Sequence, residues 1–338
     1  MKRIYTFLFA MIAMTGMLRA QWVQTGLENL NDVCFVKNSS TVAYAVGDKG
    51  TILKSTNAGT SWSQLPFPYE FNNNLRQVTF PTVDVGYVKD DFNTIYKTEN
   101  AGGKWDPLTS TPFQYSLINK IYFHSKDSGY VIADTNLYRT VNGGKNWNIV
   151  LSKNGMADVC FTTAKTGFAV TWQTNIYQTT DSGKTWASIN IGGNGNYALV
   201  KFVSVSEGFV VDQNGMVYRT TNGGSTWAPY GAPVGYNPRN MILFGPANGL
   251  MLSNMNSFFD WNVPMSTWQT KMIPAVQQAN KNINSIAASV YGTGKGIMVG
   301  EKGSIFLTND GGGNWMIQNA GASNINTLWF TDANTGFI

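Results

Sequence analysis

Short apolar segments recur along the chain, each bounded by glycine or polar residues. In the first segment of most repeats, residues i and i+2 share one face, as at 30–35, 77–80, 120–123 and 199–203. Such alternation over a few residues is typical of a half-buried β-strand. The pattern therefore predicts a chain built from short strands.

Each first strand is followed by a glycine-containing turn and a second strand, at 43–46, 86–88, 129–132, 167–170 and 208–211. A third strand follows, for example at 51–54, 94–97 and 216–219. It leads into an eight-residue segment that starts with Ser or Thr, continues with Asn or Asp and then Gly, and ends with the Trp that begins a fourth strand. We call this segment the box turn.

The box turn occurs seven times, and its Trp residues, at positions 62, 105, 147, 186, 227, 268 and 315, lie 39 to 47 residues apart. This is the period of one four-stranded propeller blade. The sixth copy has lost its Thr, Asn and Gly to Trp261, Val263 and Met265. The residues to which we assign a structural role in the box turns are Asn57, Trp62, Asn100, Trp105, Asn142, Trp147, Asp181, Trp186, Asn222, Trp227, Asp310 and Trp315.

The box turn is explained by structure alone. Asn or Asp can bond to the backbone two residues on, and Gly supplies a positive φ. The Trp would fill the space between neighbouring sheets, burying about 150 to 250 Å². We expect its replacement to cost stability and not a specific activity.

These repeats predict an all-β fold, a β-propeller of four-stranded antiparallel blades. Seven blades are expected, and an eighth composite blade from the two termini is the alternative, because residues 21–25 resemble a lone fourth strand. After a signal peptide at 1–20, residues 21–338 form a single propeller domain. Its repeat units are about 29–65, 74–110, 117–150, 157–190, 197–230, 239–271 and 283–318, with a partial, truncated unit at 325–338.

The first twenty residues read as an export signal, with Lys2 and Arg3, an apolar stretch at 4–18 and a cleavage site after Ala20. We therefore expect export to the periplasm, the cell surface or the extracellular space, with no transmembrane segment after cleavage. Cleavage removes three of the 24 basic residues and none of the 19 acidic ones, leaving a net charge of +2. A charge this small gives no case for nucleic acid binding.

The two cysteines, Cys34 and Cys160, occupy the same place in the first and fourth units. Packed sheets lie about 10 Å apart, so sites three blades apart exceed the roughly 7 Å limit between Cα atoms of a disulfide. We predict two buried, unpaired thiols.

The box turns resemble the Asp-box, or BNR, repeat of sialidases, sortilin-type ectodomains and xyloglucanases. The longer pattern, with a Gly-aromatic second strand and Ile-Tyr-x-Thr-x-Asn-Gly-Gly before the Trp, is most similar to the photosystem II stability/assembly-factor group of exported propellers. This resemblance covers about residues 29–318 and is specific for fold. It implies a non-catalytic module that binds a protein partner or a surface glycan, or acts as an assembly scaffold, without cofactor or metal.

Strand polarity assigns the loops to two faces of the ring. The turns between first and second strands and the box turns lie on one face, which we call the box face. The turns between second and third strands and the connectors between blades lie on the other, the connector face. Because connectors are longer and more variable, and binding residues concentrate on loops, we place the candidate binding residues there: Tyr69, Arg76, Tyr115, Trp172, Tyr236 and Arg239.

Catalytic interpretations have little support in the sequence. The chain has one histidine, His124, so a multi-histidine metal site is excluded. His124 lies in a polar turn and is expected to be solvated. The mature chain has four arginines, of which Arg139 and Arg219 occupy one repeat position, too few for the three-arginine clamp of a sialidase. A glycoside hydrolase of the sialidase type stays an alternative, because acids across the ring could approach one another. A passive module of a larger surface protein is another.

Overall fold

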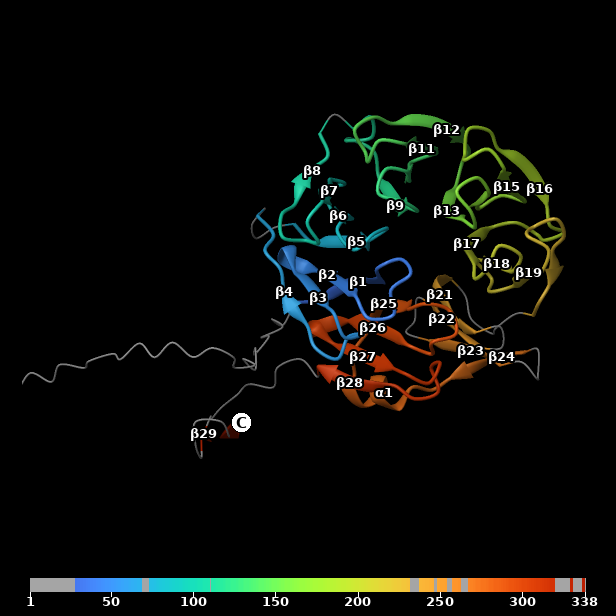
Figure 1. Cartoon of the computed structure of the whole chain (residues 1–338). Helices are drawn as coiled ribbons and strands as arrows, with labels where there is room; N and C mark the ends of the chain where they lie inside the picture. Colours follow the sequence, from blue (N-terminus) through green and yellow to red (C-terminus); the bar gives the residue numbers. More distant parts are fainter. Residues whose placement is uncertain are drawn as a thin grey trace, which may run out of the picture.

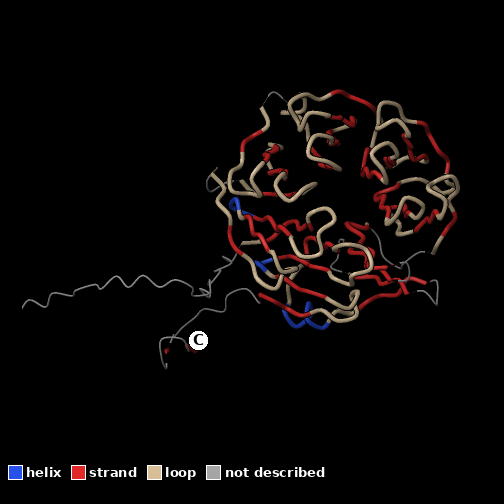
Figure 2. The backbone as a smooth tube through the Cα atoms, in the orientation of Figure 1, coloured by secondary structure: helices blue, strands red, loops and turns tan. Residues whose placement is uncertain are grey.

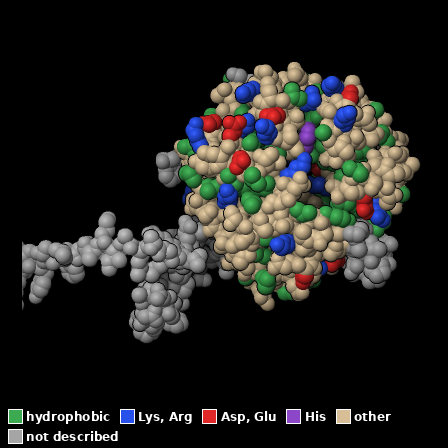
Figure 3. All heavy atoms as spheres, in the orientation of Figure 1, with side chains coloured by type: hydrophobic (Ala, Val, Ile, Leu, Met, Phe, Trp, Pro, Cys, Tyr) green, Lys and Arg blue, Asp and Glu red, His purple; other side chains and the backbone are tan. Residues whose placement is uncertain are grey.

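The structure, a computed structural model, describes residues 28–68, 73–109, 111–231, 237–245, 248–253, 257–262, 267–319, 329–330 and 336–337. Seven four-stranded antiparallel sheets form a ring in chain order (Figures 1 and 2). The predicted seven-bladed propeller is therefore confirmed. The space-filling view shows an opening at the centre of the ring, which we call the channel (Figure 3). The signal peptide and residues 21–25 lie outside the described residues.

Each blade consists of four consecutive strands, the first next to the channel and the fourth at the rim (Figure 1). Blades one to three are β1 (Leu30–Phe35), β2 (Ala43–Gly47), β3 (Ile52–Ser55), β4 (Ser63–Gln64); β5 (Leu75–Thr79), β6 (Gly86–Asp90), β7 (Ile95–Thr98), β8 (Asp106–Pro107); and β9 (Ile118–Phe123), β10 (Gly129–Ala133), β11 (Asn136–Thr140), β12 (Asn148–Ser152). Blades four and five are β13 (Met156–Phe161), β14 (Gly167–Thr171), β15 (Asn175–Thr179), β16 (Ala187–Asn190); and β17 (Tyr197–Phe202), β18 (Gly208–Asp212), β19 (Val217–Thr220), β20 (Ala228–Pro229). Blades six and seven are β21 (Pro238–Gly245), β22 (Asn248–Ser253), β23 (Phe258–Asn262), β24 (Thr267–Lys271); and β25 (Ile283–Ala288), β26 (Gly296–Gly300), β27 (Ile305–Thr308), β28 (Met316–Asn319).

Little else is regular in the described part of the chain. One α-helix, α1 (Pro274–Ala279), lies in the connector from blade six to blade seven, and single 3-10 turns at Asp48–Gly50 and Glu301–Gly303 join second to third strands. β29 (Trp329–Phe330) pairs with β30 (Gly336–Phe337) in a separate two-stranded sheet. The alternative of an eighth composite blade is wrong, because β1 of blade one packs directly against β25 and β26 of blade seven and leaves no place in the ring for another sheet.

The ring closes by contact between blade seven and blade one. The side-chain amide of Asn284 donates to the carbonyl of Leu30 at 2.8 Å, and the Ser285 hydroxyl donates to Asp32 at 2.7 Å. Apolar side chains of both blades, among them Leu30 and Ile297, share one buried cluster. Closure therefore rests on side-chain packing between two complete sheets.

Neighbouring blades are joined by aromatic stacks near the box face. The ring of Tyr44 lies on Phe80 of the next blade at 3.5 Å between centroids, and Tyr87 lies on Phe123 in the same way at 3.5 Å. The hydroxyl of Tyr44 also donates to the carbonyl of Ala101, in the next box turn, at 3.0 Å. Each stack needs a glycine in the second strand, because a Cβ on Gly86 would lie 2.4 Å from the Phe80 ring.

The box turns show how Thr, Asn and Gly cooperate. In the second copy, the Thr98 hydroxyl donates to Asn100 Oδ1 at 3.0 Å and accepts from the N–H of Gly102 at 2.9 Å. Asn100 Oδ1 accepts from the N–H of Lys104, four residues on, at 2.8 Å. The expected bond to the backbone two residues on is therefore wrong, because this longer loop places the fourth N–H at the carbonyl oxygen.

The six box tryptophans whose side chains the structure describes pack into apolar clusters between neighbouring sheets, as predicted. Trp105 is only 1% exposed, and its ring meets that of Phe80 edge to face at 6.0 Å. The sixth turn, at residues 263–266, lies outside the described residues, yet β23 and β24 pair on either side of it. Loss of the box residues has therefore not cost blade six its fourth strand.

Both thiols are unpaired, as predicted, and burial raises the pKa of each well above its usual range. Cys160 is buried as predicted, whereas the prediction of burial is wrong for Cys34, which is only partly buried. A protonated thiol is a poor nucleophile, so neither cysteine is suited to covalent chemistry.

Candidate functional site

The first strands of the blades share an irregularity at the connector-face end of the channel. In all seven, the pairing with the second strand skips one residue, which forms a β-bulge. Bulges re-aim side chains and are frequent beside functional sites. The skipped residues, which we call the bulge ring, are Asn31, Arg76, Asn119, Ala157, Ala198, Arg239 and Asn284.

The bulge ring carries positive charge, which is confined to two of its seven positions. Arg76 and Arg239 are its only charged members, and both line a channel cavity of about 490 Å³. Arg76 lies 3.4 Å from a carboxylate oxygen of Asp48 and 3.5 Å from one of Asp91. The Arg239 guanidinium meets the carbonyl of Ile283 at 3.5 Å, and no ion pair of Arg239 is found among the described residues. Arg239 is therefore the more available of the two for an anionic group.

The two alanines of the ring open a hollow at the channel mouth. A cavity of about 380 Å³ lies over Ala157 and Ala198 and is also lined by Lys120, Trp172 and Arg239. The side chain of Trp172 is 54% exposed at the rim of this hollow. A large aromatic surface and a guanidinium thus line the same hollow, a combination suited to a polar peptide or ligand group.

Deeper in the channel, the positive charges of lysines are only partly neutralised by neighbouring carboxylates. Lys120 pairs with Asp158 at 3.1 Å, and this carboxylate is the main cause of the raised pKa of Lys120. Burial, and then the positive charge of Lys120, lowers the pKa of Lys201. Burial raises the pKa of Asp32. Figure 3 shows Lys or Arg side chains inside the central hollow.

The channel carboxylates have structural partners. Asp32 Oδ2 accepts from the N–H of Val78 in the next blade at 2.9 Å, and Asp158 Oδ2 accepts from that of Val200 at 3.2 Å. Because the same bond recurs between equivalent positions of two blade pairs, these acids join adjacent first strands. One oxygen of each carboxylate is thereby bound to the backbone of the next blade.

Exposed apolar side chains lie on the connector face beside blades two and three. Tyr115 is 95% exposed, Phe92 63% and Leu117 61%. Asn93 accepts from the N–H of Ile118 at 3.0 Å, which holds the turn of Phe92 against the connector of Leu117. We call Phe92, Tyr115 and Leu117 the apolar rim. Grouped exposed apolar residues mark interaction surfaces.

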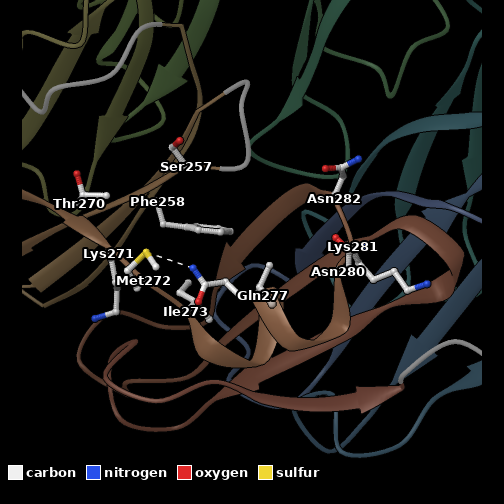
Figure 4. A pocket seen from close by; sticks show the side chains of 11 residues that line it. Ser257, Phe258, Thr270, Lys271, Met272, Ile273, Gln277, Asn280, Lys281 and Asn282 are labelled. Carbon is white, nitrogen blue, oxygen red and sulfur yellow. Dashed lines mark hydrogen bonds between the residues drawn. The ribbon is translucent and has the colours of Figure 1, made fainter.

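A further hollow on this face lies beside α1. Figure 4 shows Phe258, Ile273 and Gln277 around it, and its volume is about 530 Å³. The amide of Gln277 donates to the sulfur of Met272 at 3.2 Å. No carboxylate lines this hollow, and the Nζ of Lys271, on its wall, is paired with Asp260 at 2.8 Å. Lys281 also lines it, so the hollow combines apolar contact with positive charge and uncharged polar groups.

The structure places three of the six candidate residues, Arg76, Trp172 and Arg239, around the channel mouth, whereas Tyr115 belongs to the apolar rim. Tyr69 and Tyr236 lie outside the described residues. Sequence reasoning missed Lys120 and Phe92. Lys120 lies in the first strand of blade three, and a lysine within an otherwise apolar inner strand is a signal that can identify it.

The surroundings of His124 differ from the solvated turn that the sequence predicts. Its ring lies against Phe161, with centroids 5.2 Å apart, and burial lowers its pKa to about 4. The prediction of a solvated histidine is wrong, because aromatic residues of two blades converge on this turn. Among the residues described, no group of three or more His, Cys, Asp or Glu side chains is placed to hold a metal ion.

Comparison with known proteins adds the family. A family model described as photosynthesis system II assembly factor YCF48 matches residues 15–154 and again residues 150–291. The chain belongs to the YCF48 family. The resemblance to the photosystem II stability/assembly-factor group is confirmed by this match. No curated protein matches the chain by sequence.

Solved structures include YCF48 itself. "YCF48 bound to D1 peptide" shares 16% identity at a TM-score of 0.65, covering 85% of this chain and 94% of that one. YCF48 from Cyanidioschyzon merolae shares 14% identity at a TM-score of 0.64, covering 86% and 97%. A GH74 xyloglucanase from Xanthomonas campestris has 14% identity and a TM-score of 0.62, covering 88% and 55%. At these identities the likeness concerns the fold.

None of the helices in the described residues has the length and apolarity needed to cross a bilayer.

Proposed function

We propose that this member of the YCF48 family is an exported, non-catalytic propeller that holds a segment of a protein partner on its connector face. The observation that carries the proposal is the bulge ring, which presents Arg239 and Arg76 at a mouth flanked by Trp172 and the apolar rim. Tryptophan, tyrosine and arginine are the residues that most often dominate binding energy in protein interfaces. A YCF48 structure with a bound D1 peptide supports peptide binding as a capacity of the family.

A glycosidase is the weaker alternative. It is favoured by the likeness to a GH74 enzyme, but the channel carboxylates Asp32 and Asp158 are engaged with the backbone of the next blade. A panel of aryl glycosides tests it directly. Release of the chromophore, lost on changing either acid to Asn in a variant that still folds, would overturn the non-catalytic proposal.

Site-specific photo-crosslinking tests the proposed face. A photoreactive amino acid replaces Trp172 on the connector face or, as a control, Val205, which is 63% exposed in a turn of the box face. In cells that make the protein, we expect a discrete protein adduct from position 172 and none from position 205. Adducts only from position 205 would place binding on the other face.

Substitutions then test the contribution of each group. We expect Trp172→Ala and Arg239→Gln each to reduce the captured partner at least about tenfold, the effect of losing roughly 1.4 kcal/mol. Val205→Ala is the matched control and should leave capture unchanged. Equal capture by all three variants, with equal melting temperatures, would refute the proposed site.

Detection of the mature chain in the periplasmic or extracellular fraction tests export.

A further inference from the structure

A separate hollow lies on the box face between blades three and four, on the opposite side of the ring from the proposed partner site. Its volume is about 460 Å³. Lys37, His124 and Arg139 line it, together with the rings of Tyr122 and Phe161 and hydroxyl groups such as that of Thr163. Figure 3 shows the side chain coloured as histidine, the only one in the chain, beside Lys or Arg side chains near the central opening.

Two polar atoms of this hollow are buried without a protein partner among the described residues, His124 Nδ1 and Arg139 Nε. Buried polar atoms in native proteins are nearly always hydrogen-bonded. A ligand oxygen that approached both nitrogens would satisfy them.

Arg139 is one of four basic residues at its repeat position. The equivalent Lys97 pairs with Glu99, and the equivalent Arg219 pairs with Glu207 at 2.6 Å. The equivalent Lys54 has no ion pair among the described residues, and its Nζ donates to the carbonyl of Ala101 at 3.5 Å. In the part of the chain that the structure describes, Arg139 has no ion pair. Its charge is therefore available to an external anion.

Lys37 brings a second positive charge from blade one. Its Nζ donates to the backbone carbonyl of His124 at 2.6 Å, and its own N–H bonds the carbonyl of Phe80, so the turn that carries it leans across blade two. No Asp or Glu lines the hollow. Burial, and to a lesser extent the nearby carboxylate of Asp181, raises the pKa of Tyr130 to about 12. This carboxylate accepts hydrogen bonds from the N–H groups of Lys184 and Thr185 in its own box turn.

We propose that this hollow binds a small oxyanion, a carboxylate or a phosphate group carried by an organic molecule. Arg139 and Lys37 supply the positive charge, and His124 donates from Nδ1. Charge-assisted hydrogen bonds of this kind are about twice as strong as neutral ones. A cavity of about 460 Å³ is large enough for the carrier as well as the anion, within the usual range for ligand sites, and the Phe161 and Tyr122 rings offer it an apolar wall.

The single histidine gives the experiment a specific signal. In NMR spectra of the folded protein, the imidazole resonances belong to His124 alone. Inorganic phosphate, acetate and glucuronate are titrated at constant ionic strength, with glucose as the neutral control. We expect saturable shifts with dissociation constants of about 1 to 10 mM, a range that corresponds to weak but specific binding, and no saturable shift with glucose.

The variants separate this site from general surface charge. Arg139→Gln introduces the residue that blade four carries at the same position, Gln178, and should weaken binding at least about tenfold. Arg219→Gln is the matched control, since Arg219 occupies the same repeat position but already has Glu207, and should leave binding unchanged. If Arg139→Gln fails to fold, Lys37→Gln serves the same purpose.

Saturation by acetate and glucuronate would identify a carboxylate source, and saturation by phosphate alone a phosphorylated one. The proposal is overturned if His124 responds to none of the anions at about 50 mM, well above the expected dissociation constants, or if Arg139→Gln binds as the native chain does. Partner crosslinking at position 172 is independent of these results, so either proposal can fail alone.

Discussion

Truncation of Trp105 should destabilise the propeller by about 3 kcal/mol. At 1% exposure the side chain buries nearly its whole surface, about 200 Å², which at about 25 cal/mol per Å² corresponds to about 5 kcal/mol. The change to Ala also removes an indole N–H that is buried without a partner among the described residues, which returns about 1 to 3 kcal/mol. The difference lies at the lower end of measured Trp→Ala losses of about 3 to 5 kcal/mol.

Urea unfolding followed by circular dichroism measures this loss. With a slope m of about 3 kcal/mol per M, the midpoint of Trp105→Ala should fall by about 1 M. Tyr115→Ala is the control, because its side chain is 95% exposed and its replacement should change stability by less than about 0.5 kcal/mol. A midpoint within about 0.2 M of the native value, at unchanged m, would contradict the packing role assigned to the box tryptophans.

Three further outcomes are expected. Gly86→Ala places a methyl group against the Phe80 ring and should cost about 1 to 3 kcal/mol by overpacking; a neutral result in urea unfolding would count against the stacked blade contact. Tyr44→Phe removes the bond to Ala101 and should lower stability by about 1 kcal/mol, with no loss if that bond is absent in solution. The pKa of His124 is lowered by burial from 6.5 to about 4, so its contribution to stability is complete above about pH 6.5 and is lost as the pH falls towards 4. Melting temperatures at pH 7.5 and 5 should therefore differ more for the native chain than for His124→Gln, and equal differences would refute the assignment.

The starts of the first strands could not be predicted correctly from the sequence. Their predicted starts at residues 77, 120 and 199 fall two residues after the observed starts, Leu75, Ile118 and Tyr197. The bulge lies in this interval in each case, and an unpaired residue breaks the i, i+2 alternation on which the prediction depended. The sequence could therefore not show that Arg76 and Arg239 belong to one ring of equivalent positions.

The sequence by itself determined the repeat and the order of the four strands in a blade, because every turn and every box Trp is a local feature that recurs with the repeat. The choice between seven and eight blades was made only by the closed ring, in which blade seven contacts blade one. The sequence also determined that two cysteines three blades apart stay unpaired. The tertiary structure alone decided which side chains meet across blades. Lys37 reaches His124 from blade one, and Asp158 pairs with Lys120 across a blade boundary. Such contacts depend on the curvature of the ring and on seven bulges, neither of which a local pattern of polar and apolar residues encodes.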